Sequence, residues 1–133
     1  MKKSSLFDTL KPRSVDGLDG LFLAVVQDYK SDEVLMCAFM DEKSLELTLE
    51  TRLMHYFSTS RRSLWKKGES SGNIQEVKSV YVDCDGDALL FKVKQVGGAC
   101  HMGYRSCFYR RLADDKLEVD GVKVFEPKEV YVD

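Results

Sequence analysis

The stretch YVDCDGDALLF, residues 81–91, combines residue types that bind cations: Asp83, Cys84, Asp85 and Asp87. β-Strands usually avoid Asp and Gly, yet both flanks of this stretch have strand-like sequences. Clustered carboxylates suit a hard divalent ion such as Mg²⁺. An Asp-Gly pair between apolar runs is also the strongest short-range signal for a β-hairpin, and a charged hairpin tip needs no ion. The stretch alone therefore leaves both a magnesium site and a solvated turn open.

Three cysteines have a spacing that differs from that of structural zinc sites. Cys84 lies 16 positions before Cys100, and six residues lie between Cys100 and Cys107, so CxxC pairs are missing. Three thiolates hold Zn²⁺ and leave one tetrahedral position open, which is the catalytic arrangement. The alternative is that Cys100 and Cys107 are small buried hydrophobic residues, and spacing alone does not decide. Cys37 lies in the apolar run VLMCAFM and is predicted to belong to the core.

The two histidines have different surroundings in the sequence. His101 directly follows Cys100, a candidate zinc ligand. Because histidine exchanges protons near neutral pH, His101 is a candidate for proton transfer, although a lone histidine is more often structural. His55 lies in an apolar strand pattern, so we expect it to pack rather than to react.

The polar segment TSRRSLWKKGESSGN, residues 59–73, is too long for a tight turn. Arginine side chains, and backbone amides near glycine, are groups that hold phosphate in proteins. Trp65 either stacks on a base or anchors the segment in the core. A charged surface loop is the alternative, although the length of the segment in a compact domain favours function. The candidate substrate contacts are Arg61, Arg62, Trp65, Lys67, Ser70 and Ser71.

The bulk composition narrows the class of protein. The chain has 133 residues, of which 44% are hydrophobic and 32% charged, as in a soluble single-domain protein. A net charge of −2 argues against a nucleic-acid binder. No run approaches the roughly 20 apolar residues of a membrane span, and the N-terminus lacks the apolar core of a secretory signal. We therefore expect a cytoplasmic protein that contacts neither nucleic acid nor membrane, whose cysteines do not form disulfides.

The elements that must position these residues are mostly β. Apolar runs at 21–28 and 33–39 predict a β-hairpin that follows an irregular N-terminal arm over residues 1–20. Asp41 is a predicted N-cap, and leucines at a spacing of four predict a helix that ends near Arg52. Further strand-like runs occupy residues 53–58, 74–83, 88–96, 107–112 and, weakly, 122–125. The pattern predicts an α+β, mostly β fold, a single compact domain of β-hairpins with one main helix over residues 1–133.

Four segments between residues 34 and 110 together resemble the phosphoribosyl-AMP cyclohydrolases, enzymes of histidine biosynthesis: VLMCAFMDEKSLELTLET, SRRSLWKKGESSGN, DCDGDALL and ACHMGYRSCFYR. They occur in the order that the family has. The resemblance implies a homodimer with a β core that opens the adenine ring of phosphoribosyl-AMP between N1 and C6. Thr59 stands where the family usually has Arg, and Met102 where it usually has Thr. Neither departure replaces a metal ligand.

The resemblance also implies two metal ions, Zn²⁺ and Mg²⁺, with the first zinc-binding cysteine supplied by the partner subunit. In this scheme zinc-bound hydroxide attacks C6, a histidine assists proton transfer, and Mg²⁺ with the basic segment binds the phosphates. Cys84 is expected to point away from the aspartates, because side chains alternate along a strand. The residues so assigned are Cys84, Cys100 and Cys107 for zinc, Asp83, Asp85 and Asp87 for magnesium, and His101 as the base.

A different class of protein fits part of the pattern. A small zinc-stabilised module that binds RNA or a phosphorylated partner would also combine cysteines with a basic segment. It predicts a closed four-ligand zinc site and tolerance of substitutions at the aspartates. The sequence offers no obvious fourth protein ligand, which favours the hydrolase. A related zinc hydrolase acting on another nucleotide is a third interpretation, but the His-x-Glu and Pro-Cys-x-x-Cys signatures of zinc deaminases are missing.

Overall fold

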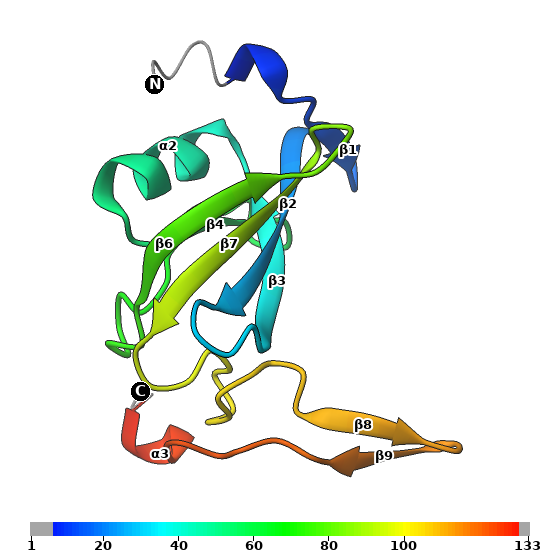
Figure 1. The fold of residues 1–133 in the computed structure, drawn as a ribbon, viewed down its shortest axis with the longest axis vertical. Helices are drawn as coiled ribbons and strands as arrows, with labels where there is room; N and C mark the ends of the chain where they lie inside the picture. Colours follow the sequence, from blue (N-terminus) through cyan, green and yellow to red (C-terminus); the bar gives the residue numbers. More distant parts are fainter. Residues whose placement is uncertain (1–6, 131–133) are drawn as a thin grey trace.

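The protein folds around one curled β-sheet with a helix across its side (Figure 1). A computed structural model describes residues 7–130. In chain order the elements are β1 (Arg13–Val15), β2 (Leu18–Asp28), β3 (Val34–Met40), α2 (Glu42–Thr51), β4 (His55–Ser58), β5 (Ser63–Lys66), β6 (Gln75–Val82), β7 (Ala88–Gln95), β8 (Arg110–Ala113), β9 (Lys116–Val119) and α3 (Pro127–Val130). The predicted α+β, mostly β fold is confirmed.

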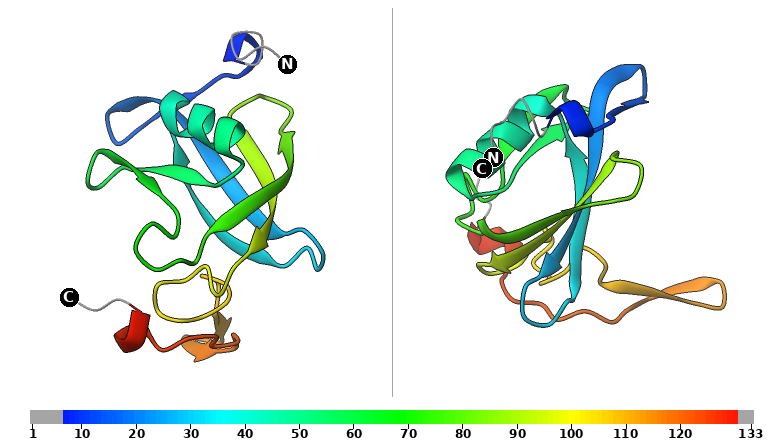
Figure 2. Two further views of the ribbon diagram at one scale, coloured as in Figure 1. Left: turned by 90° about the vertical axis from the view of Figure 1, so that its left-hand side faces the viewer. Right: turned by 45° about the horizontal axis from the view of Figure 1, so that its top comes forward.

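The strand order of the main sheet is β5-β4-β3-β2-β7-β6, and β1 pairs with the start of β2. Neighbouring strands are antiparallel except β2 and β7, which run parallel in the register Leu23 to Ala88 and Val25 to Leu90. Figure 2 shows the sheet bending round so that α2 lies against its concave side. A separate hairpin, β8–β9, projects from the opposite end of the molecule (Figure 1).

Helix α2 begins and ends where the sequence predicts. The Asp41 carboxylate accepts a hydrogen bond from the Ser44 amide at 2.8 Å, and the Ser44 hydroxyl accepts one from the Asp41 amide at 2.9 Å. This reciprocal capping box satisfies amides that would otherwise lack partners. Arg52 adopts the left-handed conformation at φ 64° and terminates the helix. The Thr48 hydroxyl then receives the His55 amide at 2.9 Å, which ties the helix to β4.

The core fills the inside of the curl. Its fully buried side chains include Val26, Leu35, Met54 and Phe91, which come from β2, β3, the end of the α2–β4 connection and β7. A polar chain crosses this core. The Tyr56 hydroxyl donates to Gln75 at 2.5 Å, and the Gln75 amide donates to Gln95 at 2.8 Å. Because Tyr56, Gln75 and Gln95 are each hydrogen-bonded, this polar chain links β4, β6 and β7 across the core. The predicted packing role of His55 is confirmed, since it is buried and its ring contacts the Leu53 carbonyl.

The prediction of an irregular arm is wrong for much of residues 7–20, and residues 1–6 lie outside the described part. β1 and the start of β2 form a hairpin there, with Asp16 and Gly17 both at positive φ (51° and 76°). An Asp-Gly pair is a strong hairpin signal, and it marks this turn. The polar segment 59–73 likewise contains a strand, β5, paired to β4.

The C-terminal predictions need correction as well. The strand predicted over 107–112 begins only at Arg110, and its partner β9 was missed. Residues 122–125 form no strand but one isolated bridge, from Lys123 to Tyr104. Short strands with few apolar residues on one face give little periodicity to detect. None of the helices in residues 7–130 is long and apolar enough to cross a bilayer.

Candidate active site

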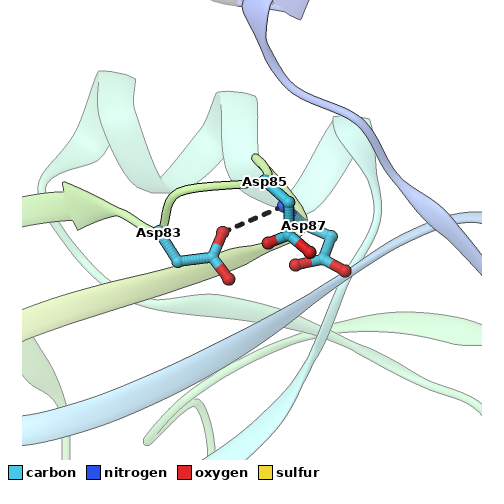
Figure 3. A group of neighbouring side chains, drawn as sticks. All are labelled: Asp83, Asp85 and Asp87. Carbon is cyan, nitrogen blue, oxygen red and sulfur yellow. Dashed lines mark hydrogen bonds between the residues drawn. The ribbon is translucent and has the colours of Figure 1, made fainter.

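The three aspartates lie together in the turn between β6 and β7 (Figure 3). One oxygen atom from each carboxylate lies within 4.8 Å of the others. The Asp83 carboxylate accepts hydrogen bonds from the amides of Asp87 and Ala88, both at 3.1 Å, which shapes the turn. Arg13 from β1 donates to the Asp87 carboxylate at 2.7 Å. The predicted Asp-Gly turn is thus confirmed, and the same turn concentrates negative charge.

The charges in this turn are not balanced. The hydrogen bond from the Ala88 amide lowers the pKa of Asp83, whereas hydrogen bonding to Asp87 and Asp83, with their negative charges, raises the pKa of Asp85. A carboxyl whose pKa is raised by neighbouring carboxyls is one that holds its proton to avoid repulsion. Oxygen ligands at this spacing suit a hard divalent cation, which would remove that repulsion. The donor set therefore fits Mg²⁺.

Cys84 lies in this turn and is exposed. The expectation that it belongs to a strand is wrong, because β6 ends at Val82 and β7 begins at Ala88. Strand alternation therefore does not set the direction of its side chain.

The other two zinc-ligand candidates lie at the opposite end of β7, in the segment 96–109. Hydrogen bonds within the segment, such as Cys100 amide to Tyr104 carbonyl at 3.1 Å, fold it into a compact loop. Gly103 has a φ of +96°, and a Cβ there would lie 2.3 Å from the Phe125 carbonyl oxygen, so only glycine fits. The Cys107 amide donates to the Leu35 carbonyl at 2.7 Å, which fixes the loop to β3.

Arg105 ties the same loop to the end of β2. Its guanidinium donates to the Asp28 carboxylate at 2.8 Å and to Glu33 at 3.1 Å. Asp28 is buried, so this charge pair is partly shielded from water. The loop that carries the two cysteines is therefore held by backbone contacts on β3 and by an ion pair on β2.

Cys100 and Cys107 are neighbours in space. Although Cys107 has solvent access, its thiol lies in a concave site, and this desolvation, together with the Cys100 thiol beside it, raises the pKa of Cys107 to about 11. At neutral pH the Cys107 side chain is therefore a thiol when no metal is bound. Metal binding displaces such protons, so the pair is suited to a thiolate-binding ion such as Zn²⁺.

Cys107 borders a cavity of about 580 Å³. Most of the predicted substrate contacts also line it, and so does His101. The cavity walls are formed by Met36, Cys37, Ala38, Arg61, Trp65, Lys66, Lys67, Gly68, Glu69, Ser70, Ser71, Ala99, His101 and Cys107. Arg62 does not line the cavity, and the aspartate turn is remote from it. The structure therefore brings together the basic segment, His101 and Cys107, which is one of the three candidate zinc ligands.

Two cavity residues have roles that the sequence did not indicate. Cys37 was predicted to be core, but it is exposed on β3 and lies in the cavity wall near Cys107. Because side chains alternate along β3, the buried neighbour is Met36 instead. Glu69 is a carboxylate in the cavity wall that we did not single out. Its signal in the sequence is that it is the one acidic residue in the basic segment 59–73.

Trp65 and Lys67 lie deeper in the wall than Arg61. The Trp65 ring packs on Tyr56 with their centroids 4.9 Å apart, which makes it an anchor of the segment, as the commoner use of tryptophan suggests. The Lys67 ammonium donates to the Ala99 carbonyl at 2.5 Å. Burial lowers the pKa of Lys67, while the thiols of Cys107 and Cys100 act in the opposite direction.

Fold and cavity together define a small β-sheet domain with a thiol- and hydroxyl-lined pocket at one end. The model of the family "Phosphoribosyl-AMP cyclohydrolase" matches residues 36–109, the part of the chain that contains the cavity wall and the aspartate turn. The chain therefore belongs to the phosphoribosyl-AMP cyclohydrolase family and is an enzyme.

Curated relatives agree with this family over nearly the whole chain. Three examples carry the name phosphoribosyl-AMP cyclohydrolase. The protein from Methanosarcina acetivorans is 60% identical over 93% of this chain and 97% of its own length. The protein from Methanothermobacter thermautotrophicus is 58% identical over 90% of this chain and 88% of its own length. The protein from Desulfotalea psychrophila is 56% identical over 86% of this chain and 91% of its own length. Membership of this family supports the hydrolase interpretation over the zinc-stabilised binding module.

Proposed function

We propose that the protein hydrolyses the N1–C6 bond of the adenine ring of phosphoribosyl-AMP, a step in histidine biosynthesis. The observation that carries the proposal is the family match over residues 36–109, because that range includes both the cavity and the aspartate turn. Lining the cavity are cationic and hydroxyl groups that suit a phosphorylated nucleotide and a histidine that suits proton transfer.

The proposed zinc ligands are Cys100 and Cys107 of one chain and Cys84 of the partner subunit. Within one chain Cys84 and Cys100 flank opposite ends of β7, an 8-residue strand. At about 3.3 Å per residue the strand spans roughly 26 Å, whereas zinc–sulfur bonds are about 2.3 Å long. This separation supports a site in which a second copy of the chain supplies Cys84.

An apolar surface on the sheet suits this second copy. Cross-strand neighbours on the outer face are Leu23, Val25, Cys37, Phe39, Tyr81 and Leu90, of which Tyr81 is 54% exposed. The face reaches the aspartate turn at one end, through a shallow apolar hollow that Asp83 borders, and the cavity at the other, through Cys37. A two-fold axis through its middle would bring the turn of each chain to the cavity of the other. Covering it would also remove apolar area from water.

The aspartates would follow Cys84 into the shared site. Because Asp83 and Asp85 are its immediate neighbours, a turn that delivers the thiol also delivers the carboxylates to the cavity mouth. Mg²⁺ held there by Asp83, Asp85 and Asp87 would neutralise phosphate oxygens of the substrate. Arg61, Ser70 and Ser71 line the facing wall and are the proposed contacts for phosphate, while Arg62 stays a prediction outside the cavity.

The chain's own groups would divide the chemistry in the following way. When bound, Zn²⁺ supplies a Lewis acid that lowers the pKa of water to about 7. His101 would accept a proton from the water that adds to C6 and return it to N1 as the N1–C6 bond breaks. Trp65 would hold the basic segment on the core, so that the phosphate contacts are in place before the substrate arrives.

A direct assay tests the proposal. Purified protein is loaded with zinc, its zinc content is measured, and the absorbance change of ring opening is followed on phosphoribosyl-AMP with and without Mg²⁺. We expect turnover that requires zinc and increases with Mg²⁺. Zinc-loaded, folded protein that leaves the substrate intact at every Mg²⁺ concentration would contradict the proposed activity.

A further inference from the structure

Lys67 is a buried cation at the wall of the cavity. The residue is 7% exposed, and its backbone amide donates to the Met54 carbonyl at 3.0 Å. Its ammonium donates to the carbonyl of Ala99, the residue directly before Cys100, at 2.5 Å. The contact joins the basic segment to the cysteine loop across 32 positions of sequence.

The position of Lys67 is fixed by the glycine that follows it. Gly68 has a φ of +81°, and a Cβ there would lie 2.6 Å from the Ile74 backbone nitrogen. Only glycine lets the chain turn so tightly at this point. The turn keeps the lysine on the inner side of the segment, while Arg61 and Ser70 remain exposed.

The ammonium has no carboxylate to balance it. Among residues 7–130 no Asp or Glu lies within 4.0 Å of the Lys67 ammonium. Its neighbours are the Ala99 carbonyl, the Trp65 ring at 5.9 Å from its nitrogen, and the thiols of Cys100 and Cys107 that act on it electrostatically. A buried charge without a counter-charge is costly, so this lysine needs an anion that a metal-free chain does not supply.

A zinc site with three cysteines supplies such an anion. One Zn²⁺ and three thiolates carry a net charge of −1, and one ammonium beside them brings the sum to zero. We propose that Lys67 is a positioning residue whose ammonium is the counter-charge of the thiolate zinc site and whose bond to Ala99 orients Cys100. The inference rests on the proposed function, and it assigns Lys67 to the metal rather than to the substrate phosphates.

Zinc affinity and stability together test this role. Zinc dissociation constants are measured by competition with a chromophoric chelator, and melting temperatures are measured with and without zinc. Lys67→Met should weaken zinc binding by about 10- to 100-fold, the usual effect of removing a group that supports metal ligands. Lys67→Arg, which keeps the charge, should bind zinc more tightly than Lys67→Met. Lys94→Met is the matched control, because Lys94 is an exposed lysine near the end of β7, and it should bind zinc as the wild type does.

The metal-free proteins separate this role from a merely structural one. Because Lys67→Met removes an unbalanced buried charge, its melting temperature without zinc should equal or exceed that of the wild type, and fall below it only with zinc. If Lys67→Met lowered the melting temperature equally with and without zinc, the inference would be wrong. It would also be wrong if the wild type bound zinc tightly and Lys67→Met bound it equally well. Neither result would contradict the proposed zinc site itself. Weak zinc binding by the wild type would overturn the proposed zinc site as well.

Discussion

Cys84 and Cys100 flank the two ends of one strand, β7, so that the turn with the aspartates and the loop with Cys100 and His101 lie at opposite ends of that strand within a chain. We therefore propose that a site using both cysteines is built from two chains. Substitutions of single cysteines can therefore test the proposed shared zinc site.

Subunit complementation tests the shared site. Cys84→Ala and Cys107→Ala homodimers should each be inactive, because every site lacks a ligand. After random subunit exchange half of the dimers are mixed, and half of the sites in those are complete, so about a quarter of wild-type activity should return. Activity is compared with that of equally treated unmixed variants. No recovery, with exchange confirmed by mass spectrometry, would exclude a site that takes Cys84 from the other chain.

Cys37 provides a second test, because it is the third thiol near the cavity of one chain. If zinc is held as proposed, Cys100→Ser loses zinc and activity, whereas Cys37→Ser retains about one zinc per chain and most of its activity. Metal content by elemental analysis, with circular dichroism as a check of folding, distinguishes the two. Loss of zinc in Cys37→Ser and full zinc in Cys84→Ser would place the site within a single chain.

Substitution of Asp85 tests whether the aspartate cluster binds Mg²⁺. Removing its charge relieves repulsion in the turn, so Asp85→Asn should keep or slightly raise the melting temperature in a chelator and lose most of the activation by Mg²⁺. Zinc content should not change. Asp115→Asn, an exposed aspartate in the β8–β9 turn, is the control for charge. If Mg²⁺ activated Asp85→Asn as strongly as the wild type, the aspartate cluster would be a plain turn that binds no ion.

His101 should affect turnover and not metal binding. We expect His101→Ala to keep its zinc and to lose roughly 10²- to 10⁴-fold in kcat, as is usual for a general acid–base group. Single-turnover rates beside zinc analysis measure this. A wild-type rate would mean that another group, such as Glu69 in the same wall, transfers the proton.

The Asp28–Arg105 pair predicts how stability depends on pH. Burial opposes ionisation of Asp28, but hydrogen bonds from Ser31 and the Lys30 amide, with the charge of Arg105, lower its pKa below the ordinary value. The pKa of Asp28 is therefore lower in the folded chain than in the unfolded chain, where it is about 3.9. The ionised Asp28 contributes its full stabilisation above that unfolded pKa, and this stabilisation is lost as the pH falls through the folded pKa.

Asp28→Asn should therefore cost about 1–3 kcal/mol of unfolding free energy at pH 7 and flatten the decline of stability below pH 4. Urea denaturation between pH 2.5 and 7 measures both effects. Asp32→Asn is the comparison, since its ion pair with Lys92 is exposed and should contribute little. An equally steep acid decline in Asp28→Asn would contradict the assignment.

Local signals in the sequence predicted the local parts of the fold. The Asp41 cap, the end of α2 at Arg52 and the Asp85-Gly86 turn each depend on a few adjacent residues, and all three are confirmed. The hairpin at Asp16-Gly17 carried the same kind of signal and was overlooked among polar neighbours.

Nonlocal features could not be predicted in this way. The uniformly apolar run that contains Cys37 gives no alternation, so it does not reveal which face of β3 is exposed. Nothing in the sequence around Lys67 indicates a contact with Ala99, because that contact depends on how two distant loops meet. For the candidate site, residue types were predictable from the sequence, but their division between two ends of the sheet required the structure.

The parallel pairing of β2 with β7 has a consequence for how the protein folds. Leu23 pairs with Ala88, so this contact closes a loop of 65 positions (88 − 23 = 65), whereas β2–β3 and β6–β7 are local hairpins. Closing a long loop costs chain entropy before any contact compensates for it, so we expect this pairing to form late and to limit the folding rate. On a ribosome, the sheet cannot close until β7 has emerged, and the cysteine loop follows only afterwards. If zinc and a second subunit bind as proposed, both would therefore bind only after β7 and the cysteine loop have been synthesised.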